Sequence, residues 1–168
     1  MAACCLATLT SCTVLDDTSG PCPKSSTTVR AGDLHGGYQG PNGMRFTLGY
    51  ASTQYPEGRT AQVGTVRVQS WPVSLEDMDE DGPVGKGFQG EGTWEFRKEE
   101  TTGGEGFRQV KLDFLHGIPE QGMPAEPQYL EIGGTPNNPE LFVETDPDTC
   151  PTTVFHRGEL TDGGVGAG

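Results

Sequence analysis

Residues 41–50 read Pro-Asn-Gly-Met-Arg-Phe-Thr-Leu-Gly-Tyr, a turn signal followed by strict alternation of apolar with polar or small side chains. Asn-Gly favours a tight hairpin turn, because both residues readily adopt positive φ angles. Apolar residues occupy every second position from Met44 to Tyr50, the period that places them on one face of a β-strand. The stretch therefore predicts a turn and a half-buried strand whose apolar face, Tyr50 included, points into a core.

Seven other short runs have the same strand-like composition and are separated by turn signals. The eight expected strands cover residues 34–38, 44–50, 62–71, 88–97, 107–115, 128–132, 140–145 and 152–157, with reversing loops at 133–139 and 146–151. Trp71 falls on the polar side of the alternation in its run, so we expect a bulge near Ser70 or a strand end where the ring caps the core. The 26 Gly and 13 Pro disfavour long helices. The sequence predicts an all-β fold, a small antiparallel barrel or a two-sheet sandwich of about eight strands with little or no helix.

Near the N-terminus, Leu9-Thr10-Ser11-Cys12 has the form of a bacterial lipobox: an aliphatic residue, two small residues and a cysteine that becomes lipidated. The residues before Cys12 supply an apolar run and a small-residue cleavage site but no Lys or Arg. We therefore expect a truncated lipoprotein signal segment over residues 1–11, with the native start upstream of Met1. Acyl chains on Cys12 would anchor the protein firmly to a membrane. The alternative is an ordinary apolar first strand or a frayed terminus.

The remaining chain has room for one domain. Residues 12–31 are rich in Ser, Thr, Gly, Pro and Asp without a hydrophobic period, which predicts a flexible tether. Residues 32–157 form the expected all-β domain. Residues 158–168 are Gly-rich and are expected to be a disordered tail.

The cysteines support an extracytoplasmic address. Two of the five, Cys4 and Cys5, belong to the signal segment and Cys12 is lipidated, which leaves Cys22 and Cys150, each followed by Pro. An even remainder in an exported chain predicts a Cys22–Cys150 disulfide. The alternative is two unpaired thiols that lie far apart.

The formal net charge of -13 excludes two classes of partner. Nucleic acids and anionic lipid surfaces would both repel the chain. The expected partners are the membrane, through the acyl anchor, and an unknown envelope protein or small ligand.

A resemblance follows from four features: the lipobox, the Ser/Thr-rich spacer, the Gly-Glu-Gly-Thr-Trp-Glu-Phe run at residues 90–96, and residues 141–157, which contain Leu-Phe-Val, Asp-Pro-Asp and Val-Phe-His-Arg. Together they resemble uncharacterised small lipoproteins of actinomycetes, over most of residues 9–157. Gly-x-Trp strands also resemble those of lipocalin-like barrels, in which the Trp packs the barrel floor. The resemblance implies an envelope location, a β-barrel-like fold and such a packing role for Trp94, and it carries over no catalytic residue.

One motif indicates a cation. Asp77, Asp79 and Asp81, followed by Gly82, match the opening of a calcium loop, in which alternate carboxylates converge on one hard ion. The twelfth position is Phe88 instead of the bidentate Glu, and Pro83 occupies the seventh. A Ca²⁺ site is therefore an alternative to a plain solvated acidic loop, and no other cofactor is expected.

The sequence contains no catalytic motif. His35, His116 and His156 lack metal-ligand spacing, and a triad of Ser74, Asp113 and His116 has no Gly-x-Ser-x-Gly elbow to support it. The candidates for lining a ligand pocket are aromatic: Tyr38, Tyr50, Trp71, Trp94 and Tyr129. Such side chains more often fill the interior of an eight-stranded barrel.

The sequence thus predicts a lipid-anchored extracytoplasmic β-domain that acts as a binding or envelope-associated module and is not an enzyme. Three alternatives remain: a lipocalin-like carrier of a small apolar ligand, a hydrolase acting on envelope polymers, and a calcium-binding surface loop. A carrier needs an open apolar cavity, and an enzyme needs a cleft with a carboxylate or histidine of perturbed pKa.

Overall fold

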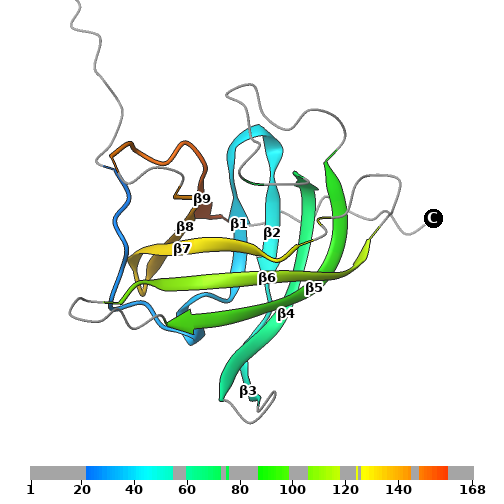
Figure 1. Ribbon diagram of the computed structural model, residues 1–168, viewed down its shortest axis with the longest axis horizontal. Coiled ribbons are helices and arrows are strands. Elements are labelled where there is room, and N and C mark those ends of the chain that lie inside the picture. Colours follow the sequence, from blue (N-terminus) through cyan, green and yellow to red (C-terminus); the bar gives the residue numbers. More distant parts are fainter. Residues whose placement is uncertain are drawn as a thin grey trace, which may run out of the picture.

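The computed structural model describes residues 22–54, 60–72, 75, 87–98, 106–117, 124, 126–144 and 148–158. These residues form nine strands: β1 (Gly36–Gln39), β2 (Arg45–Leu48), β3 (Ser52–Gln54), β4 (Ala61–Trp71), β5 (Phe88–Lys98), β6 (Arg108–Gly117), β7 (Gln128–Thr135), β8 (Asn138–Phe142) and β9 (Val154–Arg157) (Figure 1). The helices of the described part are two short 3-10 turns, at Ala31–Asp33 and Pro41–Gly43. The all-β prediction is confirmed, and each of the eight expected strands overlaps an observed one.

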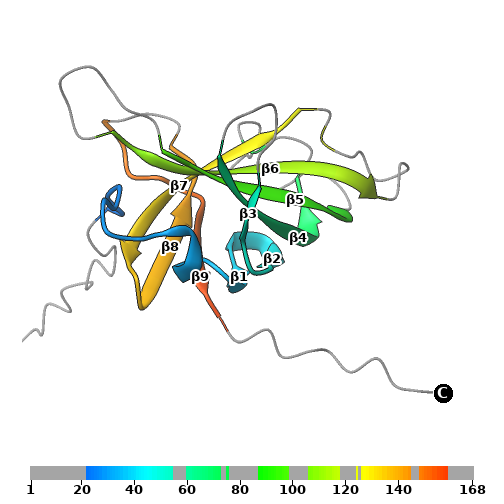
Figure 2. The ribbon, with the colours of Figure 1, turned by 90° about the horizontal axis from the view of Figure 1, so that it is seen from below.

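Eight of the strands close into an antiparallel barrel. The sheet follows the order β2-β1-β9-β8-β7-β6-β5-β4-β3, and an additional pairing of β2 with β4 completes the circle. Seen from below, β6 lies on one side of the barrel and β1 and β9 lie on the other (Figure 2). Of the two architectures expected, the structure is the barrel, with β3 as an extra strand. No helix in the described ranges is long and apolar enough to cross a membrane.

A bulge separates β2 from β3 and corrects the prediction for Tyr50. Both strands pair with β4, through Leu48 opposite Val66 in β2 and Ser52 opposite Val63 in β3. Because residues 49–51 face only residues 64 and 65, the chain carries one extra residue here, as in a β-bulge. The extra residue ends the inward alternation, and Tyr50 is 79% exposed. The expectation that Tyr50 faces the core was wrong.

The expected bulge near Ser70 is confirmed. The register between β4 and β5 shifts between Val68 and Trp71, and Ser70 has a positive φ of 54°. The shift reverses the side of the sheet on which the following residue lies. Trp71 is consequently fully buried, although its position in the alternation places it among polar residues.

The loop expected at residues 133–139 is much shorter than predicted. Thr135 pairs with Asn138, so the chain reverses over Pro136 and Asn137 alone. Gly134 has a φ of +70°, a conformation that glycine adopts without strain, and this lets the hairpin turn tightly. Of the Gly and Pro residues that indicated a loop, Gly133 and Gly134 therefore lie within β7 and Pro139 within β8, and only Pro136 lies in the turn.

The barrel interior is a single apolar core. Tyr38 illustrates its packing: the ring stacks on Phe46 with centroids 4.9 Å apart, and the hydroxyl donates a hydrogen bond to the Leu34 carbonyl oxygen at 2.9 Å. Burial raises the pKa of Tyr38 to about 12, and the nearby guanidinium of Arg157 opposes this rise. The hydroxyl therefore remains a neutral donor at physiological pH.

A flexible tether was expected over residues 12–31, but from Cys22 onward the structure shows an ordered segment that contacts the barrel. Residues 22–29, named the strap below, run along the outside of the barrel past β7 and β8, in dark blue in Figures 1 and 2. Ser25 forms a β-bridge with Gly133, and the Ser26 amide donates to the Ile132 carbonyl oxygen at 2.7 Å. Val29 and Ala31 are buried, so the folded domain begins about ten residues earlier than composition predicts.

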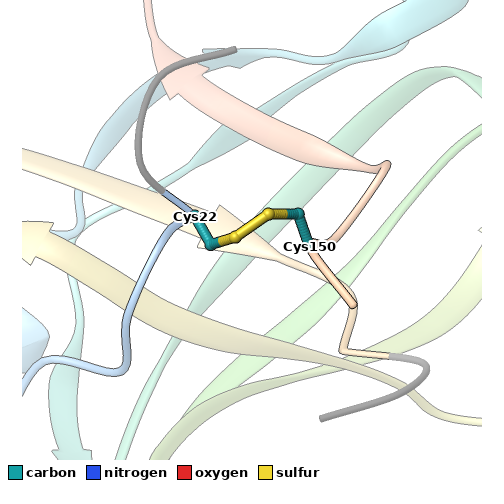
Figure 3. Close-up of a disulfide and its surroundings, with 2 residues drawn as sticks. All are labelled: Cys22 and Cys150. Atoms are coloured by element: carbon teal, nitrogen blue, oxygen red, sulfur yellow. A yellow bond between two sulfur atoms is a disulfide. The ribbon is translucent and has the colours of Figure 1, made fainter. Parts of the chain in front are cut away.

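Cys22 and Cys150 form a disulfide, as the cysteine count predicts, with 5.1 Å between their Cα atoms. Figure 3 shows the bond joining the start of the strap to the segment that precedes β9. The two residues are 128 positions apart. A crosslink over a loop of this length stabilises a protein by about 5 kcal/mol in the chain-entropy model.

Gly64 is expected to be required for the packing of Trp94. The two residues are opposite each other in β4 and β5, and the Trp94 Nε1–H donates to the Gly49 carbonyl oxygen at 3.0 Å. A Cβ at Gly64 would overlap Nε1 and lie 2.9 Å from that oxygen. We expect Gly64→Ala to lower the free energy of unfolding by about 1–3 kcal/mol, the usual cost of overpacking, measured by urea denaturation followed by Trp fluorescence. Gly32→Ala is the control, because a Cβ there meets nothing within 4 Å, and an equal loss in both variants would contradict the prediction.

Candidate functional site

The five aromatic candidates for a ligand pocket do not gather in one place. Tyr38, Trp71 and Trp94 are fully buried in the core, whereas Tyr50 and Tyr129 are 79% and 42% exposed. Tyr50 stacks on the ring of His35 at a centroid distance of 4.2 Å, on the outer surface. Three of the five aromatic candidates therefore belong to the core and two to the surface, so they do not line one pocket.

The buried rings contact one another across the barrel. Phe155 lies 5.1 Å from Phe46 and 5.5 Å from Trp71 between ring centroids, and Phe46 packs edge-on against Trp71 at 5.4 Å. Phe114 continues the series, at 5.9 Å from Trp71 and 5.5 Å from Phe88. These distances are those of rings in direct contact. The middle of the barrel is therefore filled by side chains.

One polar atom in this interior lacks a partner. The indole Nε1 of Trp71 is buried and has no hydrogen-bond acceptor among the described residues. A buried N–H group without an acceptor costs about 1–3 kcal/mol. The N–H is available to any acceptor that reaches the interior.

A groove opens on the outer wall of the barrel, beside the disulfide. Its volume is about 1000 Å³. One wall is the strap from Cys22 to Thr28, and the remainder is built by Gly134, Thr135 and Glu140 of the β7–β8 hairpin and by Cys150, Pro151, Val154 and His156 in and before β9. This strap groove has the size of a small-molecule site.

The strap groove carries a paired acid and base. Glu140 and His156 are opposite each other in β8 and β9, and the Nδ1 of His156 lies 3.2 Å from a carboxylate oxygen of Glu140. The pair is partly exposed, at 25% for the Glu140 side chain and 64% for that of His156. An Nδ1–H donated to Glu140 restricts the ring and leaves Nε2 as an acceptor for another group. The strap adds the ammonium of Lys24 and a row of hydroxyls, so the groove can exchange hydrogen bonds with a polar ligand.

A carboxyl of β7, that of Glu131, contacts the strap. Ser25 Oγ donates a hydrogen bond to Glu131. Burial raises the pKa of the Glu131 carboxyl, the Ser25 hydrogen bond opposes the rise, and a hydrogen bond and the charge of Glu144 add to it. Glu131 therefore contacts the strap through Ser25 and shares a hydrogen bond with Glu144.

Other candidate residues lie outside the described part of the chain. These are Cys12, the acidic loop with Asp77, Asp79 and Asp81, and Ser74, which the sequence analysis considered as a triad residue. Within the described ranges, no group of three His, Cys, Asp or Glu side chains is placed to hold a metal ion. The sequence offered His156 only as a histidine without metal-ligand spacing, and its partner Glu140 was not identified, because the pairing depends on the register of β8 and β9.

The raised pKa of Glu131 predicts a pH dependence. A carboxyl whose pKa is higher in the folded chain than in the unfolded chain stabilises the fold fully below its ordinary pKa, and the stabilisation is lost as the pH rises through the raised value. Glu131→Gln keeps an acceptor for Ser25 and removes the titration. We expect the urea midpoint of the wild type to fall further than that of the variant between about pH 4 and about pH 8. Glu126→Gln removes an exposed carboxyl and should leave the wild-type profile unchanged; identical profiles for all three proteins would refute the assignment.

Comparison with protein-family models, with curated proteins and with solved structures finds no match for this chain.

Proposed function

We propose that this chain is a lipid-anchored, extracytoplasmic β-domain that acts as a binding or envelope-associated module, and that it holds its ligand in the strap groove. The observation that carries the proposal is the contrast between a barrel interior filled by contacting rings and a groove of about 1000 Å³ on the outer wall. A carrier of the lipocalin type needs its space inside the barrel. Among the described residues, the open space of this size lies on the outer wall.

The address is supported by two independent features of the sequence and structure. Leu9-Thr10-Ser11-Cys12 has the lipobox pattern, and the Cys22–Cys150 disulfide is typical of proteins that fold in an oxidising compartment. Cys22 follows Cys12 by ten residues, which span at most about 35 Å when fully extended. An acyl anchor on Cys12 would therefore keep the strap groove close to the membrane surface.

The chemistry of the strap groove favours a polar ligand that carries hydroxyl, amide or amino groups. Glu140 accepts hydrogen bonds, Lys24 donates them, and the hydroxyls of Thr27 and Thr135 can do both. Val154, Pro23 and Pro151 add apolar contact area. A segment of an envelope polymer has this mixture of groups.

The second candidate is a carrier of a small ligand inside the barrel. It is favoured by the buried Nε1–H of Trp71, which has no acceptor among the described residues. A ligand bound there would need an acceptor atom and would have to displace ring contacts. It would also quench or shift the fluorescence of Trp71 on binding.

The anchor is tested by fractionation of cells that express the chain with its upstream genomic sequence. We expect the wild type in the membrane fraction with acyl mass on Cys12, because two or three acyl chains anchor a protein stably. The Cys12→Ala variant lacks the lipidation site, so we expect to find it in the soluble fraction. Cys22→Ser should keep the acyl mass, since it changes a cysteine outside the lipobox. An unmodified soluble protein that retains residues 1–11 would overturn the address.

The ligand site is tested by co-sedimentation with purified cell-wall sacculi. Val154→Trp fills the strap groove, and we expect it to reduce the bound fraction by about tenfold relative to the wild type, a change of about 1.4 kcal/mol in binding free energy. Glu140→Gln should weaken binding by a smaller factor, because the amide retains one acceptor. Leu115→Trp adds the same ring at an exposed position of β6, outside the groove, and should bind as the wild type does.

Two results would contradict this assignment. Equal binding by the wild type and Val154→Trp would move the site away from the strap groove. Saturable binding of a fatty acid with quenching of Trp fluorescence, unaffected by Val154→Trp, would establish the carrier in its place.

A further inference from the structure

We propose that the Cys22–Cys150 disulfide is a redox switch for the strap groove: the oxidised form keeps the strap docked as the wall of the groove, and the reduced form releases it. This inference rests on the strap groove being the ligand site proposed above. It adds a mechanism that opens and closes that site without unfolding the barrel.

The disulfide is accessible from solution. Cys22 and Cys150 are both exposed, and both line the strap groove. Exposed disulfides have higher reduction potentials than typical structural disulfides of secreted proteins, and they are the ones that exchange with dithiols or act in regulation. A dithiol reductant can therefore reach this bond in the folded protein.

The reaction is a thiol–disulfide exchange. One thiolate of the dithiol attacks the sulfur of Cys22 or Cys150 and releases the other as a thiolate, which takes up a proton. The second thiol of the reductant, deprotonated, then attacks the mixed disulfide. The pair Cys22 and Cys150 gains two electrons and two protons overall, and the dithiol is oxidised to a disulfide.

Within the described part of the chain, a bridge and two hydrogen bonds to β7 would hold the strap after reduction. Between Cys22 and Val29, the described contacts to β7 are the bridge of Ser25 with Gly133, the 2.7 Å hydrogen bond from the Ser26 amide, and the hydrogen bond from Ser25 to Glu131. The far end is fixed more firmly, since Val29 is fully buried and its carbonyl oxygen accepts from Arg108 at 2.6 Å. Release is therefore expected to free residues 22–28 and to leave Val29 in place as the hinge.

Release removes one wall of the strap groove and changes the barrel surface beneath it. Leu141 belongs to the core, so the next residue of β8, Phe142, points to the opposite face, where it is 2% exposed. A Cβ built on Gly133 would lie 3.0 Å from both the Lys24 carbonyl oxygen and the Phe142 ring, so strap, glycine and ring lie in close succession. Removing the strap exposes the Phe142 ring and frees the Ile132 carbonyl oxygen for another donor.

The barrel itself does not depend on the strap. All eight strands of the circle are paired on both edges with other strands, and the strap adds one isolated bridge to β7. Loss of the disulfide lowers the free energy of unfolding because it removes a constraint on the unfolded chain. It does not remove a strand from the barrel.

The test is hydrogen exchange of the full chain, followed by mass spectrometry, with and without a dithiol reductant. We expect reduction to speed exchange at the Ser26 amide by about tenfold or more, while amides of β4 and β5 keep their protection. The double variant Cys22→Ser/Cys150→Ser retains the other cysteines and should show the fast exchange in both conditions. Unchanged exchange at Ser26, or loss of protection at β4 and β5 to the same extent, would each overturn the switch.

Co-sedimentation with sacculi in both redox states separates this proposal from the one on which it rests. A bound fraction that changes on reduction in the wild type and not in the double variant supports the switch. Binding that is equal in both states despite strap release refutes control of the groove by the disulfide. If the strap is released but sacculi bind in neither state, the proposed ligand site is refuted, and its regulation with it. Hydrogen exchange would still show that the disulfide controls strap release.

Discussion

The structure depends on the closure of the sheet by β2. This strand of four residues pairs with β1 on one edge and with β4 on the other, so Phe46 lies opposite both Tyr38 and Val68. Without the β2–β4 pairing, β2 and the part of β4 from Val66 to Gln69 would each have an open edge, which invites association with other chains. Closure also fixes the space inside the barrel, and every inward side chain has to share it.

Because the barrel is closed and ring contacts fill its middle, a ligand has more room on the outer wall than inside. Trp71 enters the core because the bulge at Ser70 reverses its side, and its ring then contacts Phe46, Phe114 and Phe155. The outer wall is not strongly charged, since the described residues contain nine Lys or Arg and nine Asp or Glu. The net charge of -13 therefore belongs to the other segments of the chain, and the scaffold around the strap groove is electrically balanced.

The sequence predicted those features that depend on local pattern. Alternation identified the strands and the inward residues of β4 and β6, and the misplaced Trp71 identified the bulge. The cysteine count predicted the disulfide. Alternation failed at Tyr50 and the loop prediction failed at Gly134, because a bulge and a positive φ depend on the register of neighbouring strands. The strap groove was not predicted for the same reason: Glu140 and His156 meet only through the pairing of β8 with β9.

The strap shows how a covalent bond can decide whether a polar segment is ordered. From Cys22 to Val29 it contains one fully buried apolar residue, Val29, and otherwise Cys, Pro, Lys, Ser and Thr. Such a composition buries too little apolar area to offset the entropy of about 1–2 kcal/mol lost per ordered residue. Composition alone therefore predicts a tether. The disulfide fixes the first residue and the core fixes the last, so the segment between them loses much of that entropy in advance, and a few hydrogen bonds then suffice to dock it. Whether the strap is ordered consequently depends on whether the Cys22–Cys150 disulfide is oxidised or reduced, and a redox switch requires this dependence.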